Sequence, residues 1–296
     1  MTTGEPVAPG LSTSAGRSGP RPGPDLFGGR RSDGRRPVLI AVASTVVVFG
    51  LLAAVIVNAP GWPTIQETFF NPKYWDESWP NQVSAIVVNI QAFLIAEVLI
   101  LPFALVIAIL RSLPGPVFFP IRLMATIYAD FFRGVPGVVL IFLIGFGVPT
   151  LGFDWLPNDP FVFGIIVLVL IYTAYVSEVY RAGIESIHPS QAAAARSLGL
   201  SHVQALRYVV IPQAIRRVVP PLLNDFIGLQ KDTALISFIG VIEVFRQAQI
   251  DESASFNFTP YMVTAVLFLI LTIPLARTTD WLVARERRRQ LATMAR

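Results

Sequence analysis

The chain of 296 residues is too apolar for a soluble protein: 53% of its residues are hydrophobic, 14% are charged, and its mean hydropathy is +0.61. Ordinary soluble domains carry about 25% charged residues, so this composition indicates a protein with several membrane spans. The formal net charge is +4, and the absence of cysteine excludes disulfides, thiol nucleophiles and cysteine-ligated metals. With two histidines and no Gly-Lys pair, the sequence offers neither a histidine-rich metal site nor a P-loop. We therefore expect no cofactor, and any ATP that drives this protein must be bound by another chain.

The N-terminal part of the chain combines a polar tail with one apolar span. Residues 1–37 are rich in glycine, proline, serine and arginine, and we expect a disordered cytoplasmic tail because they cannot bury enough apolar surface to fold. Residues 38–57 contain no charge and would form a helix of about 30 Å, the thickness of a bilayer core. Signal-peptide cores are about 7–15 residues long, so residues 38–59 are predicted to be an uncleaved transmembrane helix.

Five further apolar segments predict an all-α, polytopic membrane protein with six transmembrane helices. These segments are residues 83–110, 120–150, 161–187, 220–242 and 261–281. A Gly-Val-Pro-Gly sequence after Arg133 interrupts the second of them. The transmembrane domain is predicted over residues 80–285, followed by a basic cytoplasmic tail at 286–296.

Charged residues fall unevenly on the two sides of this arrangement. The three connections that would lie outside the cell, residues 59–82, 150–160 and 243–260, hold two basic and eight acidic residues. Most arginines lie in the other connections and at the chain ends. The positive-inside rule then predicts a multi-pass protein of the plasma membrane with both termini in the cytoplasm. This topology and contact with anionic membrane lipids explain the basic composition without nucleic acid, for which the tail lacks interleaved aromatic residues.

The connection between the fourth and fifth spans carries the signal of a short helix. In the sequence SQAAAARSLG, Ser190 suits the N-cap, the alanines favour helix, and Gly199 suits the residue after the C-cap. A helix of about two turns is marginal in water and needs a surface to pack against. It either rests on the ends of the spans or docks in a cleft of a cytoplasmic partner, which small alanines would allow to approach closely.

This loop, residues 190–215, resembles the EAA loop of ABC importer permeases, which in that family forms the coupling helix that fits into the ATPase subunit. Further stretches resemble motifs of the same family in the expected order, at residues 128–136, 174–184, 211–214 and 229–235. The resemblance covers about residues 83–285 and is specific to polar amino acid permeases, with a look closest to actinobacterial glutamate permease subunits. It implies a type I ABC importer permease fold and a subunit that takes up a polar amino acid, with glutamate favoured, and that is not itself an enzyme.

The resemblance also implies partners and contact residues. The expected partners are a dimer of ATP-binding subunits, a second permease subunit, identical or different, and an extracytoplasmic substrate-binding protein. Contacts with the ATPase are expected from Ser190, Gln191, Ala192, Ala193, Ala194, Gly199 and Pro212. The sequence departs from the family at Ala193, where an acidic residue is usual, and at Ser190, where glycine is usual. The first departure puts one polar contact with the ATPase in question, but not the fit of the helix.

Ionisable residues within membrane spans are costly and usually face the interior of a bundle. Glu178, Arg181 and Glu185 lie at positions i, i+3 and i+7 and therefore share one face of the fourth span. They either form a ladder of ion pairs within the helix or, at Glu178, contact the ammonium group of a substrate.

Two cations are candidate contacts for the carboxylates of an anionic substrate such as glutamate. Arg133 lies beside the Gly-Val-Pro break, and broken helices often build substrate sites in transporters, although Asp130 at i−3 is an alternative partner. Lys231 precedes Asp232, and the alternative is local pairing of these two residues with Asn224 and Asp225, one or two turns earlier. The predicted substrate path is therefore lined by Arg133, Glu178 and Lys231.

Two other classes of protein fit the sequence less well. An ion-coupled secondary transporter would work without an ATPase and would show internal inverted repeats, which the hydropathy pattern lacks. A membrane-embedded enzyme would need a constellation of catalytic groups, yet the two histidines, His188 and His202, flank the short helix and no metal-ligand spacing occurs. We therefore predict neither catalytic nor metal-binding residues.

Overall fold

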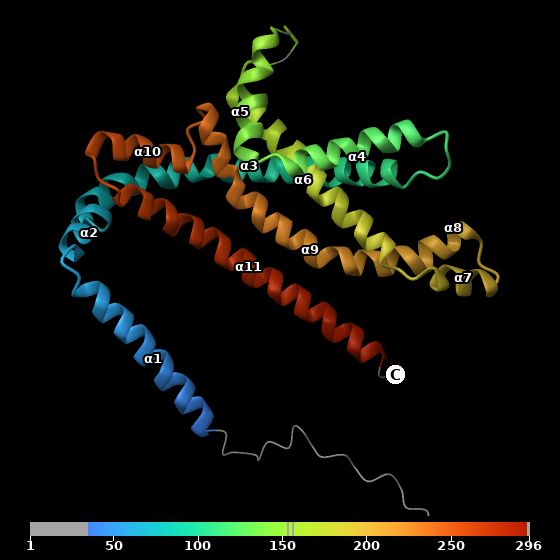
Figure 1. The fold of residues 1–296 in the computed structure, drawn as a ribbon, viewed down its shortest axis with the longest axis horizontal. Helices are drawn as coiled ribbons and strands as arrows, with labels where there is room; N and C mark the ends of the chain where they lie inside the picture. Colours follow the sequence, from blue (N-terminus) through green and yellow to red (C-terminus); the bar gives the residue numbers. More distant parts are fainter. Residues whose placement is uncertain (1–34, 153, 156, 295–296) are drawn as a thin grey trace, which may run out of the picture. The chain divides into compact units, whose positions relative to one another are not determined.

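The described residues are all-helical, which confirms the predicted fold class (Figure 1). We expect residues 1–37 to be a disordered tail. Residues 1–34 of this tail lie outside the described part of the chain. The chain divides into two units, residues 1–62 and 63–296. The computed structural model describes residues 35–152, 154–155 and 157–294.

The first unit contains a single long helix, α1 (Arg35–Val57). All described side chains of this helix are exposed, and residues 38–57 are long and apolar enough to cross a membrane. The segment predicted as the first transmembrane helix, residues 38–59, is therefore helical up to Val57, and the helix ends two residues earlier than predicted.

The second unit opens with a short helix, α2 (Trp62–Phe69), and the 41-residue helix α3 (Pro72–Ser112). The side chain of Asn71 caps α3 by accepting a hydrogen bond from the backbone N–H of Lys73 at 3.1 Å. The helix ends before Leu113, which precedes a proline and adopts an extended backbone. Much of the first expected connection, residues 59–82, is thus helical.

The third predicted span is broken into two helices, α4 (Phe119–Gly134) and α5 (Gly137–Gly147), which meet at an angle of 111°. Val135 leaves the helix with a ψ of 132°, because a following proline disfavours the helical region, and Pro136 has no N–H to continue the helix. The break therefore falls where the sequence predicts an interruption.

Helix α6 (Pro160–Glu185) is the most buried of the four helices that are long enough to cross a membrane, and it packs against α3, α4, α5 and α9. It follows the single turn η1 (Pro149–Leu151) and begins where Asp159 accepts a hydrogen bond from the N–H of Phe161 at 2.9 Å. At Gly164, a Cβ would lie 2.7 Å from Cγ2 of Ile236, so the close approach of these two segments requires glycine.

The remaining elements include one more bent pair. They are α7 (Pro189–Ser197), α8 (His202–Ala205), η2 (Leu206–Val210), α9 (Ile211–Asp232), η3 (Thr233–Ile239), α10 (Val244–Ser255) and α11 (Thr259–Met294). The segment that contains α9 and η3 meets α10 at 51°. Helix α10 lies within the connection expected at 243–260, and α11 continues through residues 286–294, which we expect as a tail.

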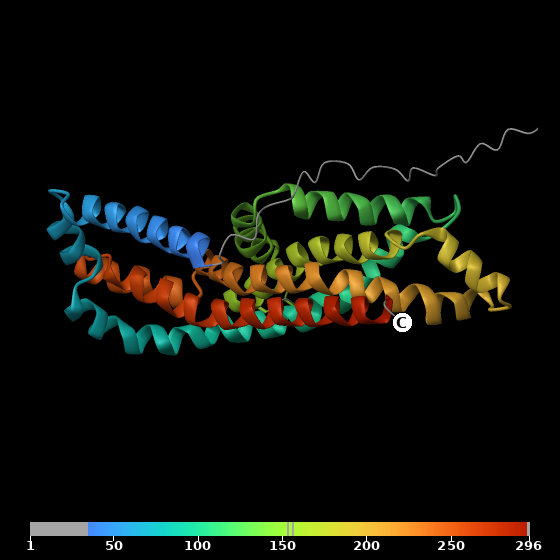
Figure 2. The same cartoon turned by 90° about the horizontal axis from the view of Figure 1, so that it is seen from below.

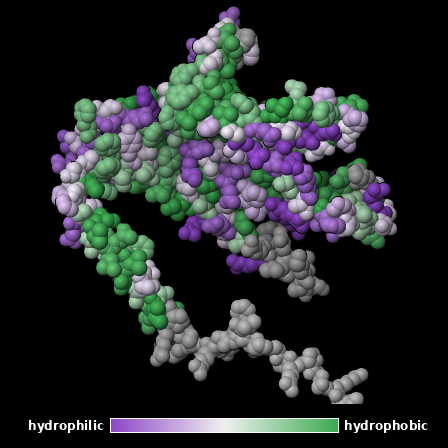
Figure 3. Space-filling view, in the orientation of Figure 1, coloured by the Kyte–Doolittle hydropathy of each residue, from purple (hydrophilic) through white to green (hydrophobic). Residues whose placement is uncertain are grey.

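Four described helices are long and apolar enough to cross a membrane, and the two bent pairs bring the number to six if each pair counts as one span. Within the second unit, α3, α6, α9 and α11 run lengthwise, with α7 and α8 at one end and α2 and α10 at the other (Figures 1 and 2). Hydrophilic residues gather over the middle of the face in Figure 3, whereas α5 is covered by apolar residues. The second unit therefore combines an apolar exterior with a polar face.

Candidate functional site

Helix α7 begins before the predicted start, which corrects the assignment of Ser190 as its N-cap. Pro189 occupies the first turn, where its fixed φ suits a helix and its missing N–H costs no hydrogen bond. His188 is the N-cap: its Nδ1 accepts a hydrogen bond from the backbone N–H of Ser190 at 3.2 Å and lies 2.8 Å from the hydroxyl of the same residue. The His-Pro sequence therefore starts the helix, and Ser190 lies inside it.

The end of α7 is closed by Gly199, in the position that the sequence predicts. Its φ is +90°, a left-handed conformation that glycine adopts without the steric cost of a β-carbon. The N–H of Gly199 donates to the carbonyl of Arg196 at 2.9 Å, and the N–H of Leu200 donates to that of Ala195 at 3.3 Å. These two bonds form a Schellman motif, which satisfies carbonyls at the end of the helix.

Helix α7 packs on the rest of the second unit through one face. Ala195 is buried, and Ala192 is half-buried against a small apolar cluster that consists of Ile187, Val210 and Ala214. The opposite face is exposed and consists of Ser190, Gln191, Ala193, Ala194, Ser197 and Leu198. Leu198 is 85% exposed on this face. Helix α7 is therefore packed against its own chain through one face, and its exposed face consists mostly of small residues.

The seven residues predicted to contact an ATPase differ in their accessibility. Ser190, Gln191, Ala193 and Ala194 lie on the exposed face of α7, whereas Ala192 faces its own chain. Gly199 is exposed after the end of the helix, and Pro212 is exposed in the first turn of α9.

Glu178 lies at the centre of a charge cluster that joins α3, α4 and α6. Its carboxylate accepts a hydrogen bond from Arg111 at 2.6 Å, pairs with Arg181, and lies 3.7 Å from the guanidinium of Arg133. Arg181 also pairs with Glu185 at 2.6 Å, so the ion-pair ladder predicted within α6 is present. With three arginines and two glutamates, the cluster carries one positive charge in excess.

The alternative that Asp130 is the ion-pair partner of Arg133 is wrong. Asp130 is exposed and forms no ion pair with any residue that the structure describes, whereas Arg133 reaches across to Glu178 and lies 5.9 Å from the ring centre of Tyr175. The physical reason is the packing of α4 on α6, which places a partly buried carboxylate and an aromatic face within reach of the arginine.

Lys231 lies apart from this cluster, near the end of α9. Its side chain is exposed and forms no ion pair with a described residue. The neighbouring Asp232 accepts a hydrogen bond from the hydroxyl of Tyr172 at 2.8 Å, so it is held by α6 and not by the lysine. The structure therefore brings Arg133 and Glu178 together but leaves Lys231 separate.

Sequence reasoning missed two polar contacts between distant segments. The side chain of Arg111, which is 11% exposed, counts in the sequence as one more basic residue of a cytoplasmic connection, yet it binds a glutamate 67 positions away. Buried Asn89 donates to Glu243 at 2.8 Å and accepts from the N–H of Val244 at 3.1 Å, which ties α3 to the start of α10. The signal that could have revealed the second contact is a lone polar residue, Asn89, in an apolar span, because buried polar groups need hydrogen-bond partners.

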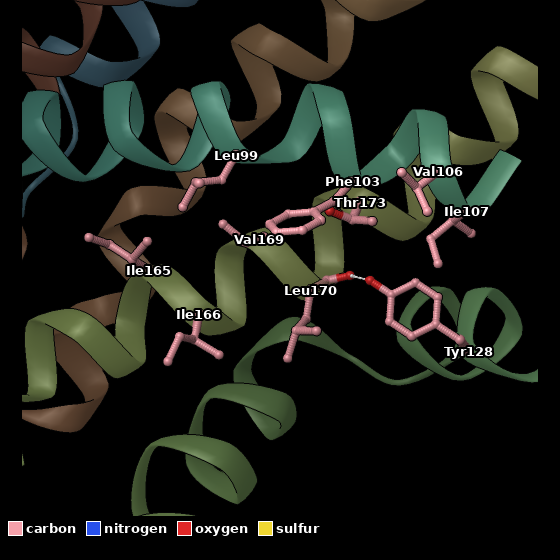
Figure 4. A pocket seen from close by; sticks show the side chains of 10 residues that line it. All are labelled: Leu99, Phe103, Val106, Ile107, Tyr128, Ile165, Ile166, Val169, Leu170 and Thr173. Carbon is pink, nitrogen blue, oxygen red and sulfur yellow. Dashed lines mark hydrogen bonds between the residues drawn. The ribbon is translucent and has the colours of Figure 1, made fainter. Parts of the chain in front are cut away.

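An apolar crevice of about 390 Å³ opens between α3, α4 and α6 (Figure 4). Tyr128 reaches across it from α4, and its hydroxyl donates to the carbonyl of Leu170 at 2.7 Å. None of its ten lining residues is charged, so it lacks the groups that a charged amino acid would need. Among the described residues, no group of three histidine, aspartate or glutamate side chains gathers as a metal site.

Comparison with known proteins identifies the family. Residues 116–288 match the family described as binding-protein-dependent transport system inner membrane component. The probable glutamine ABC transporter permease protein GlnM of Bacillus subtilis (strain 168) is 35% identical over 170 residues, which cover 57% of this chain and 77% of that protein. The glutamine transport system permease protein GlnP of Escherichia coli (strain K12) is 37% identical over 156 residues, or 52% of this chain and 70% of that protein.

Solved structures agree with this result. A crystal structure of an amino acid ABC transporter with histidines is 34% identical, has a TM-score of 0.64 and matches 70% of this chain and 94% of that chain. An inward-facing MetNI methionine ABC transporter is 18% identical, with a TM-score of 0.56 over 69% of this chain and 95% of that chain, and supports the fold alone. Membership of such a family implies an ATPase partner and a substrate-binding protein. Because the family match covers more than half of the sequence, the chain belongs to the binding-protein-dependent inner membrane components, and it is the non-catalytic permease subunit of an amino-acid ABC importer.

Proposed function

We propose that this permease imports glutamate and that α7 is the coupling helix through which the ATPase drives transport. The observation that carries the proposal is the exposed, small-residue face of α7. The helix packs against its own chain through Ala192 and Ala195 on the other face. Relatives described as glutamine and amino-acid permeases support a polar amino acid as substrate. The resemblance to actinobacterial glutamate permeases supports glutamate in particular.

The coupling role is tested by Gly199→Val in the reconstituted complex of the permease with its ATPase. Because Gly199 has a φ of +90°, valine is strained there and should tilt the exposed face of α7. We expect uptake to fall about tenfold while ATP hydrolysis continues, since the strain of a left-handed residue is about 1–2 kcal/mol. The matched control is Gly115→Val, because Gly115 has a φ of +88° and open space around it, but lies in the loop between α3 and α4.

Equal losses of uptake in both variants would contradict a specific role of α7. The chain has no cysteine, so Ser197→Cys provides a unique crosslinking site on the exposed face. Crosslinks from this site should reach the ATPase. Crosslinks that reach only lipid or the chain's own spans would contradict the proposal.

We propose Arg133 and Lys231 as contacts for the substrate carboxylates and Glu178 as a contact for its ammonium group. A doubly carboxylated amino acid in a low-dielectric path needs cations, because an unpaired buried charge is expensive. We expect Arg133→Gln and Lys231→Gln to lower the preference for glutamate over glutamine by about 10-fold to 100-fold, the value of one charged hydrogen bond. Lys73→Gln is the control, since Lys73 is the other lysine of the chain and lies over the ring of Tyr74.

Uptake is to be compared in complexes whose ATPase is still stimulated by the binding protein. An unchanged preference in both Arg133→Gln and Lys231→Gln would assign these residues a structural role, and the binding protein alone would then set specificity.

We further propose the assembly and orientation that the sequence predicts. Two permease subunits, identical or different, would form the path with two ATPase subunits and an extracytoplasmic binding protein, within a membrane whose anionic lipids contact the basic side. Both termini would be cytoplasmic, and nucleic acid would take no part. Single-cysteine variants test the orientation in intact cells: an impermeant maleimide should label Ser253→Cys on α10 but not Ser201→Cys after α7. Copurification of the complex identifies the second permease subunit.

A further inference from the structure

A second apolar crevice, of about 570 Å³, lies between α3, α6 and α9. It is found at the end of the second unit that carries α7, because Ile109 is three residues from the end of α3 and Ile184 is one residue from the end of α6. Its volume is within the range of about 300–1,000 Å³ that ligand sites in proteins have. Three of the large apolar residues that line it are about half exposed: Ile109 (52%), Ile211 (48%) and Ile215 (55%).

Two arginines lie close in the chain to residues that line this crevice on the side of α7. Arg207 lies four residues before Ile211, which lines the crevice. Its exposed guanidinium lies 5.8 Å from the ring centre of Tyr208 and forms no ion pair with a described residue. At the junction of α9 with α6, Arg217 donates to the carbonyl of Ser186, so a second guanidinium lies close to Ile184.

We propose that this crevice binds an acyl chain of an anionic phospholipid from the cytoplasmic leaflet, with the lipid phosphate at Arg207. Going back along the chain from Ile211, which lines the crevice at the start of α9, the segment η2 presents first aromatic Tyr208 and then basic Arg207. Acyl chain, interfacial region and phosphate follow one another in the same order with depth in a bilayer. A neutral hydrocarbon chain leaves the arginine without a counter-charge, whereas a phospholipid supplies both groups at once.

The crevice shares one residue with the apolar cluster against which α7 packs. Ala214 lines the crevice and also belongs to the apolar cluster against which Ala192 of α7 packs. An occupied crevice therefore fixes the wall of α9 that supports α7. The inference deepens the proposed function and rests on its orientation, in which α7 lies on the cytoplasmic side.

The test uses the full chain in nanodiscs and its lack of native cysteine. A small fluorophore on Ile215→Cys is compared with one on Phe103→Cys, because Phe103 is 52% exposed and lines the crevice of Figure 4, which has no charged residue. Brominated phosphatidylglycerol or brominated phosphatidylcholine, each at the same fraction of an otherwise identical bilayer, serves as the quencher. We expect about fivefold preference for the anionic lipid at position 215, the effect of one arginine near the surface, and no preference at position 103.

Combining Ile215→Cys with Arg207→Gln should abolish the preference, and Arg207→Lys should retain it. Equal quenching by both lipids at position 215 in the chain with Arg207 intact would overturn the proposal. So would a disulfide between the Ile215→Cys residues of two copies, which would assign the crevice to a second permease subunit. Quenching needs neither ATPase nor substrate, so the failure of glutamate uptake or of coupling leaves this result readable on its own.

Discussion

The charge cluster around Glu178 makes a prediction whose size follows from its geometry. In Glu178→Gln, the 2.6 Å contact with Arg111 and the pair with Arg181 lose their negative charge, and the side chain of Arg111 is only 11% exposed. Breaking a buried ion pair costs about 3–5 kcal/mol, and the glutamate side chain is 23% exposed, so the lower end applies. We expect the free energy of unfolding to fall by about 3 kcal/mol, measured as reversible unfolding of the purified chain in mixed micelles.

The matched control is Glu185→Gln, which removes a carboxylate from the same helix and the same Arg181. That glutamate pairs at 2.6 Å but is 59% exposed, so its loss should cost about 0.5 kcal/mol. Adding Arg111→Met to Glu178→Gln should recover about 1–2 kcal/mol, because the stranded guanidinium is then removed. Equal costs for the two glutamine variants, or strict additivity with Arg111→Met, would refute the view that this cluster holds α3 to α6.

Three further predictions concern packing, a buried polar contact and the N-terminal helix. Gly164→Ala should lower the free energy of unfolding by about 1–3 kcal/mol, because its Cβ would lie 2.7 Å from Ile236, whereas Gly147→Ala, with open space around it, should not. Asn89→Ala should cost about 1–3 kcal/mol and speed hydrogen exchange in the first turn of α10, because the buried carboxylate of Glu243 loses one of its three donors and the N–H of Val244 loses its acceptor; unchanged exchange would contradict this. Deletion of residues 1–59 should lower expression or assembly more than uptake per assembled complex, and assembled complexes without uptake would show that α1 takes part in transport.

Local chain geometry was the part of this protein that its sequence predicted best. The break after α4 and the left-handed conformation of Gly199 both depend on one or two residues, a proline and a glycine, whose backbone preferences hold in almost any context. The start of α7 was missed because two local signals compete at adjacent positions. Serine is a good N-cap, but a proline just before it fits the first turn, which moves the cap to His188.

Contacts between helices were beyond prediction from the sequence for a physical reason. Spacing within one helix correctly indicated the ladder from Glu178 to Glu185, because positions i, i+3 and i+7 meet on any regular helix. The same rule favoured Asp130 as the partner of Arg133, and tertiary packing overruled it. Which helix packs on which depends on the whole set of apolar faces, so the partner of Arg111 could not be found from the positions near it.

The arrangement of these charges also orders the three proposed substrate contacts. Glu178 has three guanidinium partners, so a substrate ammonium group would have to displace part of a cluster that already satisfies the carboxylate. Arg133 belongs to the same cluster, although at 3.7 Å it is held more loosely than Arg111. Lys231 is exposed and has no ion-pair partner among the described residues, so a carboxylate that binds it pays no cost of breaking an existing pair. Of the two cation variants, Lys231→Gln should therefore reduce the preference for glutamate more than Arg133→Gln, and the opposite order would mean that the cluster around Glu178 opens during transport.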